Sequence, residues 1–245
     1  MFYIVIPCYN EEKRLDKGIF VNFMDRYVNE ILLFVNDGST DKTLSIIEHL
    51  QESFPKRIMI LSLKKNSGKA AAVRYGILKL INNSPEDSTI GFYDSDHSTP
   101  IEEMVIMNKI LIEKNIALVA GSRIKKMGSK ILRNPLRHIF GRLAATLIGY
   151  IIKLGFYDTQ CGAKVMTKSA ATIAFKDEFI SNWLFDVEII LRLKKKFGNK
   201  ISDQIFEYPL TQWIFKEGSK IKPLEPFKLL WHLYRIHKKY KIILK

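Results

Sequence analysis

Two aspartates separated by one residue are the sharpest chemical signal in the sequence. Asp94, Ser95 and Asp96 directly follow the apolar run Thr89–Tyr93. Carboxylates at this spacing, on a turn that leaves a strand, can share a divalent cation with a bound diphosphate, because Mg²⁺ and Mn²⁺ prefer oxygen ligands. The alternative is a solvated turn in which the aspartates accept local backbone hydrogen bonds. The other polar clusters of the chain favour a site for Mg²⁺ or Mn²⁺ at Asp94 and Asp96.

Two more clusters have the chemistry of a nucleotide site. Asp37 can accept hydrogen bonds from a base or a ribose, and Gly38 beside it permits a tight backbone. Gly68 and Lys69 open an expected helix, whose N-terminus and ammonium can face a nucleotide or phosphate. This second cluster lacks the spaced upstream glycine of the nucleotide-triphosphatase loop, so helix capping is the competing interpretation.

The elements that position these clusters alternate between strand and helix. Apolar, β-rich runs are separated by amphipathic stretches of helical length, which predicts an α/β fold with a mainly parallel sheet flanked by helices. Ligands of such sheets bind beyond the carboxyl ends of the strands, and five polar clusters lie there. The expected strands are Phe2–Pro7, Ile31–Val35, Ile58–Leu63, Thr89–Tyr93 and Ala117–Ala120, and the expected helices are Glu12–Tyr27, Asp41–Glu52, Lys69–Ile81 and Pro100–Lys114.

A capping box from Thr99 to Glu102 is expected to start the last of these helices at Pro100. The second half of the chain is less regular. We expect one domain over 1–245, with a nucleotide-binding half (1–122), an acceptor-side half (123–222) and an amphipathic C-terminal helix (223–245). The later expected elements are helices over Arg133–Phe156, Lys164–Phe175 and Trp183–Phe197, a strand over Lys200–Tyr208 and a loop over Pro209–Pro226.

The positive charge is concentrated in two segments. Of the 245 residues, Arg123–Tyr157 carries a charge of +8 and Lys216–Lys245 a charge of +7, which accounts for the whole formal excess of +14. Such segments attract phosphates, anionic lipids or nucleic acids. The most apolar stretch, Leu143–Ile152, is too short for the ~20 residues that span a bilayer, so we expect peripheral membrane contact. Two cysteines and no visible signal peptide predict a cytoplasmic location.

Several motifs together resemble the inverting family 2 glycosyltransferases of the GT-A fold. The first four motifs carry the general resemblance, and the last three resemble dolichyl-phosphate glucosyltransferases and, more distantly, polyprenyl-phosphate mannosyltransferases. The motifs are Ile6–Glu12, Asn36–Thr43, Asn66–Gly76 and Asp94–Pro100, then Asp158–Lys164, Trp183–Glu188 and Glu217–Lys220.

The resemblance implies a role for each matching position. It implies a metal-dependent hexosyltransferase that uses UDP-glucose, or in second place GDP-mannose, and acts on a polyprenyl or dolichyl phosphate. Asp94 and Asp96 would bind the metal-diphosphate, with Arg123 and Arg137 on phosphate. The residues expected around the nucleotide are Pro7, Tyr9, Glu11 and Asp37.

The acceptor decides whether the reaction needs a base. A lipid monophosphate is already ionised at neutral pH, whereas a hydroxyl of a glycolipid, lipid-linked saccharide or polysaccharide needs a carboxylate to take its proton. Asp186 and Glu188 are the candidates for that base. The basic, aromatic stretch Pro226–Tyr240 fits contact with the cytoplasmic membrane face. No nucleic-acid partner is expected, because the acidic sheet edge disfavours a non-catalytic binding module.

Overall fold

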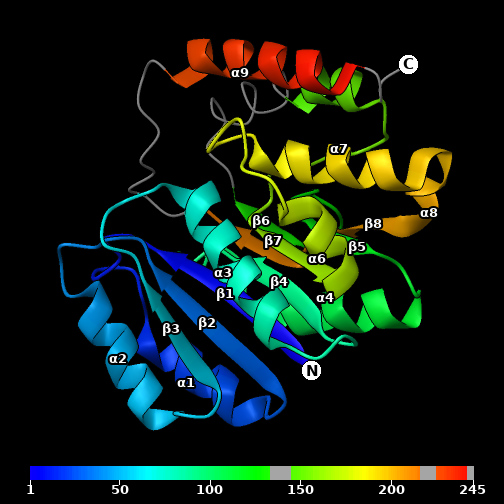
Figure 1. Cartoon of the computed structure of the whole chain (residues 1–245). Coiled ribbons are helices and arrows are strands. Elements are labelled where there is room, and N and C mark those ends of the chain that lie inside the picture. The colour runs from blue at the N-terminus through cyan, green and yellow to red at the C-terminus, as the bar shows by residue number, and fades with distance from the viewer. Residues whose placement is uncertain (133–144, 216–224, 242–245) are drawn as a thin grey trace.

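A seven-stranded mixed sheet dominates the structure, a computed structural model that describes residues 1–132, 145–215 and 225–241, with only the backbone described for 225–229. Its strand order is β3-β2-β1-β4-β7-β5-β8 (Figure 1). Neighbouring strands are parallel except that β7 runs antiparallel to β4 and β5. The strands are β1 Phe2–Cys8, β2 Glu30–Asn36, β3 Ile58–Ser62, β4 Thr89–Tyr93, β5 Leu118–Ser122, β7 Ala163–Thr167 and β8 Ile205–Pro209.

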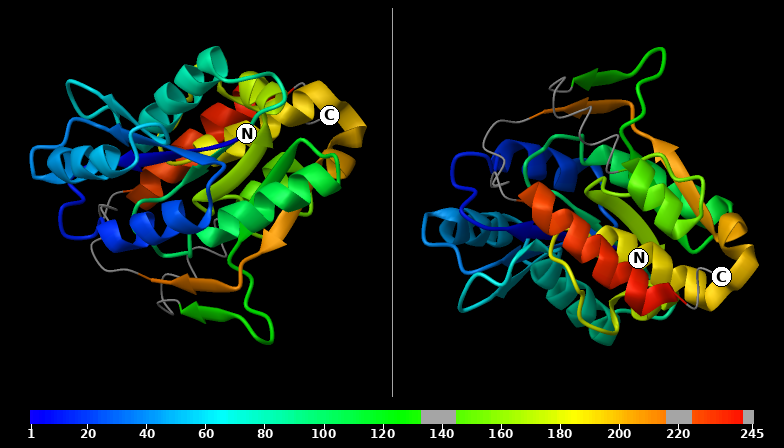
Figure 2. Two further views of the ribbon diagram at one scale, coloured as in Figure 1. Left: turned by 90° about the horizontal axis from the view of Figure 1, so that it is seen from below. Right: turned by 90° about the horizontal axis from the view of Figure 1, so that it is seen from above.

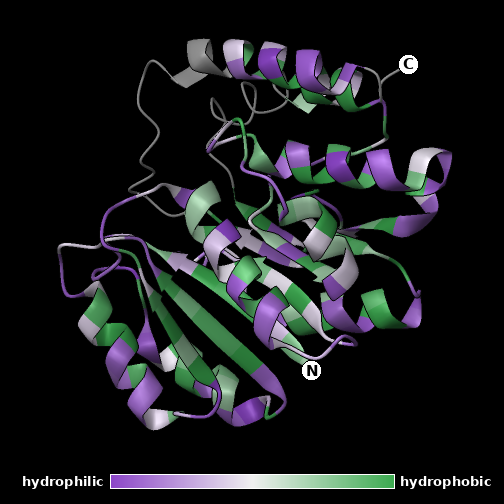
Figure 3. Cartoon of the chain, viewed as in Figure 1, coloured by the Kyte–Doolittle hydropathy of each residue, from purple (hydrophilic) through white to green (hydrophobic). Residues whose placement is uncertain are grey.

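Strand β1 explains why the sheet needs helices on both faces. Ile4 and Ile6 belong to the apolar cluster on one face, and Tyr3 and Val5 belong to the cluster on the other. Because both faces are buried, the central strands are hydrophobic along most of their length, as their colouring in Figure 3 shows.

Helices cover the two faces in separate sets. On one face pack α1 (Lys17–Arg26), α2 (Thr43–Ser53) and α4 (Glu102–Glu113), and on the other pack α3 (Lys69–Asn83), α6 (Lys168–Phe175) and α7 (Phe185–Phe197). Helix α3 lies close against the strands at Gly76, where a β-carbon would lie 2.6 Å from a methyl group of Val5. This close packing fixes the position of Lys69, the first residue of α3, relative to the edge of the sheet.

A third layer lies beyond α7. Helix α9 (Glu225–Tyr240) packs with α7 and with the helical residues 145–152 around a separate apolar cluster (Figure 1). Elsewhere, β6 (Lys130–Leu132) and β9 (Gln212–Ile214) form a small parallel sheet that projects from the side of the main sheet (Figure 2). The short helices η1 (Gly198–Lys200) and α8 (Ile201–Gln204) lead into β8. In the described residues, no helix is both long and apolar enough to cross a membrane.

Several expected elements are corrected by the structure. The stretch Lys164–Phe175 is not one helix, since β7 ends at Thr167 and the Thr167 side chain caps α6 through the backbone N–H of Ala170. The strand expected over Lys200–Tyr208 begins only at Ile205, after α8. The loop expected over Pro209–Pro226 contains β9. Of the helix expected over Arg133–Phe156, residues 133–144 lie outside the described chain.

The expected starts of two helices are also wrong. Helix α4 begins at Glu102 with Ile101 as its N-cap, and no side chain forms a capping hydrogen bond there. Helix α1 begins at Lys17, where Asp16 accepts a hydrogen bond from the backbone N–H of Gly18.

Candidate active site

The turn after β4 brings Asp94 together with Lys69. Asp94 Oδ1 lies 2.6 Å from Lys69 Nζ, and these side chains are 34% and 41% exposed. Burial raises the pKa of Asp94, the charges of Asp96 and Asp186 add to this, and Lys69 opposes it. Burial acts to lower the pKa of Lys69, but Asp94 and Asp186 outweigh it and raise that pKa. Four of the expected site side chains therefore interact at one edge of the sheet.

The Asp94–Asp96 turn offers two carboxylates as candidate ligands for a divalent cation. Asp96 Oδ1 accepts a hydrogen bond from the backbone N–H of Ser98 at 2.9 Å. A β-carbon on Gly162 would lie 1.9 Å from Asp94 Oδ2, so the glycine makes room for this carboxylate. Within the described residues no cluster of three His, Cys, Asp or Glu side chains occurs. A cation held here would complete its shell with substrate phosphate and water, as Mg²⁺ commonly does.

Asp37 organises the loop that carries Gly68 and Lys69. Its two carboxylate oxygens accept the backbone N–H groups of Ser67 at 2.8 Å and of Gly68 at 2.9 Å. Gly68 has φ +89°, in the left-handed region that favours glycine. The expected contact of Asp37 with a nucleotide stays a prediction, and the structure adds a second role for this carboxylate.

The residues expected around the nucleotide follow β1. Pro7 lies within β1, and Tyr9 is half-buried just beyond its end. Glu11 is buried and forms a bidentate ion pair with Arg14, with distances of 2.6 and 2.7 Å. A hollow of about 440 Å³ lies between this loop and the turn after β4, lined by Lys13, Arg14, Leu15, Asp16, Ile19, Asp96 and His97.

Arg123 lies beyond β5 in a tight ion pair with Asp158. The guanidinium donates to both carboxylate oxygens at 2.6 and 2.8 Å, and its carbon lies 5.3 Å from the centre of the Trp213 ring. Although burial acts to raise it, the pKa of Asp158 falls to about 2 because Arg123 holds the ionised carboxylate. Arg123 also interacts electrostatically with Asp94, so it belongs to the same edge. Arg137 lies outside the described residues.

The two candidate bases have different surroundings. Asp186, in the first turn of α7, is 4% exposed and pairs with the ammonium of Lys164 at 2.5 Å. Glu188 is fully buried, where it accepts the backbone N–H of Ile180 at 2.7 Å and lies 3.3 Å from the Tyr240 hydroxyl of α9. Asp186 thus faces the site, and Glu188 faces the contact with α9.

Sequence reasoning missed the roles of Gly162 and Lys164. Because β7 is antiparallel, the residues before it return to the edge where the parallel strands end, and the carbonyl of Gly162 accepts the N–H of Asp94 at 3.1 Å. The motif Asp158–Lys164 supplied the resemblance without a structural role. Val165 and Met166, after a glycine, were the available strand signal.

Solved structures share the architecture of this chain. Glucosyl-3-phosphoglycerate synthase from Mycobacterium tuberculosis in complex with phosphoglyceric acid superposes with a TM-score of 0.67 at 17% identity, covering 96% of this chain and 79% of that one. Its complex with Mn²⁺, uridine diphosphate and glucosyl-3-phosphoglycerate gives 0.67 at 16% identity, covering 100% and 80%. The fold is that of the GT-A glycosyltransferases.

Sequence comparisons then give the family. The sequence profile of glycosyl transferase family 2 matches residues 3–175, and the chain belongs to that family. Dolichyl-phosphate beta-glucosyltransferase ALG5A of Trichomonas vaginalis is 31% identical over 245 residues, covering 95% of this chain and 72% of the relative. ALG5C of the same organism is 34% identical, covering 95% and 69%. The human dolichyl-phosphate beta-glucosyltransferase is 28% identical, covering 90% and 69%. This chain is therefore a glycosyltransferase.

Proposed function

We propose that this glycosyltransferase moves glucose from UDP-glucose to dolichyl phosphate or another polyprenyl phosphate, with inversion at the anomeric carbon. The names of its relatives support this acceptor and sugar. The observation that carries the proposal is the meeting of Asp94 and Asp96 with the cations Lys69 and Arg123 at one sheet edge. Acidic ligands for a metal and basic groups for phosphates are the two components that this reaction requires.

The donor half of the proposal assigns the nucleotide to the loops after β1, β2 and β3. Pro7, Tyr9, Glu11 and Asp37 would surround the nucleoside, with Gly68 at the start of α3. Asp94, Ser95 and Asp96 would bind the diphosphate through Mg²⁺ or Mn²⁺, which would neutralise charge on the leaving diphosphate. Lys69 would then turn from Asp94 to a phosphate oxygen.

The acceptor half uses the ionised phosphate as the nucleophile. A phosphate oxygen of the lipid attacks the anomeric carbon, the bond from that carbon to the diphosphate oxygen breaks, and UDP leaves with the electron pair. No proton has to move, because the monoester is already ionised at neutral pH. Arg123, which Asp158 and Trp213 hold in place, would orient the phosphate.

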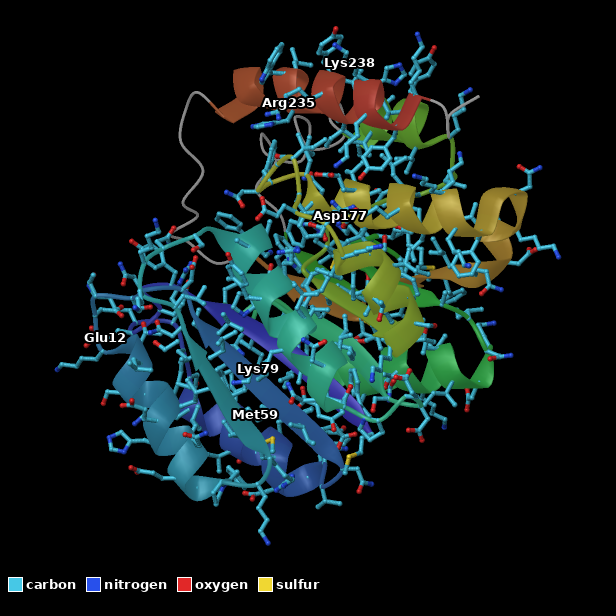
Figure 4. The ribbon with its side chains drawn as sticks, in the orientation of Figure 1. Glu12, Met59, Lys79, Asp177, Arg235 and Lys238 are labelled. Carbon is cyan, nitrogen blue, oxygen red and sulfur yellow. The ribbon has the colours of Figure 1, made fainter. Side chains whose placement is uncertain are left out.

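The proposal also includes contact of α9 with the cytoplasmic face of a membrane. Three large side chains on this helix are more than half exposed, namely Leu230, Trp231 and Tyr234, and the two rings stack at 5.9 Å. Basic residues, including Arg235 and Lys238, accompany them on the same helix (Figure 4). An apolar stripe with flanking cations favours an anionic lipid surface.

The deciding experiment is a transfer assay with labelled UDP-glucose and GDP-mannose against dolichyl and undecaprenyl phosphates, each with Mg²⁺ or Mn²⁺. We expect transfer of glucose to lipid phosphate. Transfer to a saccharide hydroxyl alone, with a strict requirement for Asp186, would replace this proposal by the hydroxyl-acceptor alternative.

Membrane contact is tested by sedimentation with anionic liposomes, comparing Trp231→Ala with Tyr75→Ala, an exposed aromatic on α3. Equal binding of both variants would exclude α9 as the contact.

A further inference from the structure

Lys164 is an unusual residue to find in the centre of a sheet. It lies in β7 between β4 and β5, and its side chain has no exposed surface. Its ammonium lies 2.5 Å from Asp186 Oδ1 and 2.7 Å from the backbone carbonyl of Cys161, and 5.4 Å from the centre of the Phe92 ring. A buried ammonium is tolerated only where such partners compensate for its lost hydration.

The partner of Lys164 lies beside the proposed diphosphate site. Lys69 Nζ lies 6.0 Å from the centre of the ring of Phe185, the residue before Asp186, and the charge of Asp186 contributes to the raised pKa values of Lys69 and Asp94. A lone carboxylate there would repel the donor diphosphate, so the charge of Lys164 makes the position compatible with an anionic ligand. Asp186 Oδ1 accepts a hydrogen bond from Lys164. The other carboxylate oxygen, Oδ2, can accept a hydrogen bond from a sugar hydroxyl.

The segment before Lys164 contacts two further side chains of the site. Asp158 holds Arg123, and Gly162 makes room for the carboxylate of Asp94. The seven residues 158–164 thus touch side chains that follow β5 and β4 and one that lies on α7. This arrangement gives the Asp158–Lys164 motif a physical purpose, which is to fix three site groups relative to one another.

We infer that Lys164 is a positioning residue that holds Asp186 where it accepts a hydrogen bond from a hydroxyl of the sugar being transferred. The inference rests on the proposed nucleotide-sugar donor. Asp186 contacts the sugar, and Lys164 acts through Asp186 without touching the substrate. Loss of Lys164 therefore weakens binding of the nucleotide-sugar more than binding of the nucleotide alone, which is affected only by the uncompensated charge of Asp186.

The test compares the binding of UDP-glucose and UDP to the full chain by titration calorimetry. Lys164→Met is expected to weaken UDP-glucose binding about tenfold and UDP binding by a smaller factor, and Asp186→Asn is expected to weaken UDP-glucose binding about tenfold and UDP binding less than about twofold. The matched control is Lys168→Met. Lys168 is also buried and also pairs with a carbonyl and a carboxylate, but it lies beyond the opposite end of β7, against Ser84 and Glu86.

A double variant separates positioning from stability. Lys164→Met with Asp186→Asn removes both charges, so it avoids the buried, unpaired carboxylate that the single lysine change leaves. If Lys164 acts through Asp186, the double variant binds UDP-glucose as well as Asp186→Asn does. Binding about tenfold weaker than that of Asp186→Asn, or unchanged binding in Lys164→Met, would overturn the inference. Because the readout is donor binding, a wrong acceptor in the proposed function leaves this test intact.

Discussion

Replacement of Lys69 by methionine is expected to strengthen binding of Mn²⁺ in the absence of nucleotide. The ammonium lies 2.6 Å from Asp94 Oδ1, so a cation that binds Asp94 must first displace it. At this separation the attraction is about 1.6 kcal/mol in a water-like dielectric. The two side chains are 41% and 34% exposed, and exposed ion pairs contribute at most about 1 kcal/mol once screening and side-chain entropy are included. We therefore expect Mn²⁺ to bind more tightly, by up to about fivefold.

Electron paramagnetic resonance of free Mn²⁺, at constant ionic strength, measures this affinity directly. The control is Lys65→Met, which removes an equal charge from an exposed position in the same loop. General electrostatic attraction predicts that both variants gain equally, whereas displacement from Asp94 predicts a gain for Lys69→Met alone. Unchanged or weaker Mn²⁺ binding by Lys69→Met would refute the competition between ammonium and metal.

Three further outcomes are expected. Gly162→Ala should lower kcat at least about tenfold in the transfer assay with little change in circular dichroism, because its β-carbon displaces the carboxylate of Asp94. Asp158→Asn should lower the free energy of unfolding in urea at pH 7 by about 2 kcal/mol or more, because Arg123 holds the pKa of Asp158 at about 2 against 3.8. A lowered pKa stabilises the folded state above about pH 4, so the deficit should shrink as the pH falls from 4 toward 2, and a constant deficit would contradict this cause. Tyr240→Phe removes the hydroxyl that joins α9 to buried partners on α7, so thermal denaturation should occur a few degrees lower, about 1 kcal/mol in stability, without loss of donor binding.

The parallel half of the fold could be predicted because its signals are local. Each strand from Phe2 to Ala120 is a short apolar run followed by polar residues, and the structure confirms all five strands. Once the strands are predicted, the polar residues that follow them, including Asp37, Lys69 and Asp94, can be assigned to the loops at the strand ends. The prediction that these loops share one edge needed only the rule for parallel sheets.

The second half depends on contacts that no local pattern contains. Val165 and Met166 lie beside the helix formers of α6, so the boundary between strand and helix was missed. The burial of Lys164 is set by β4 and β5 on either side and by Asp186 from α7, and a lysine in isolation predicts an exposed position. The choice between Asp186 and Glu188 likewise required the position of α9.

The insertion of β7 between β4 and β5 has a consequence for the order of folding. The two outer strands of this trio, β4 and β5, come first along the chain, yet in the sheet they are joined only through β7, a strand from far downstream. The ends of the segment between Ser122 and Ala163 must come together before β7 can pair with β4 and β5. We expect the entropy cost of this closure to make the step slow relative to assembly of β1, β2 and β3. We expect the loops after β1, β2 and β3 to form early on a growing chain, and the carboxylate geometry at Asp94 to be completed only when β7 is in place.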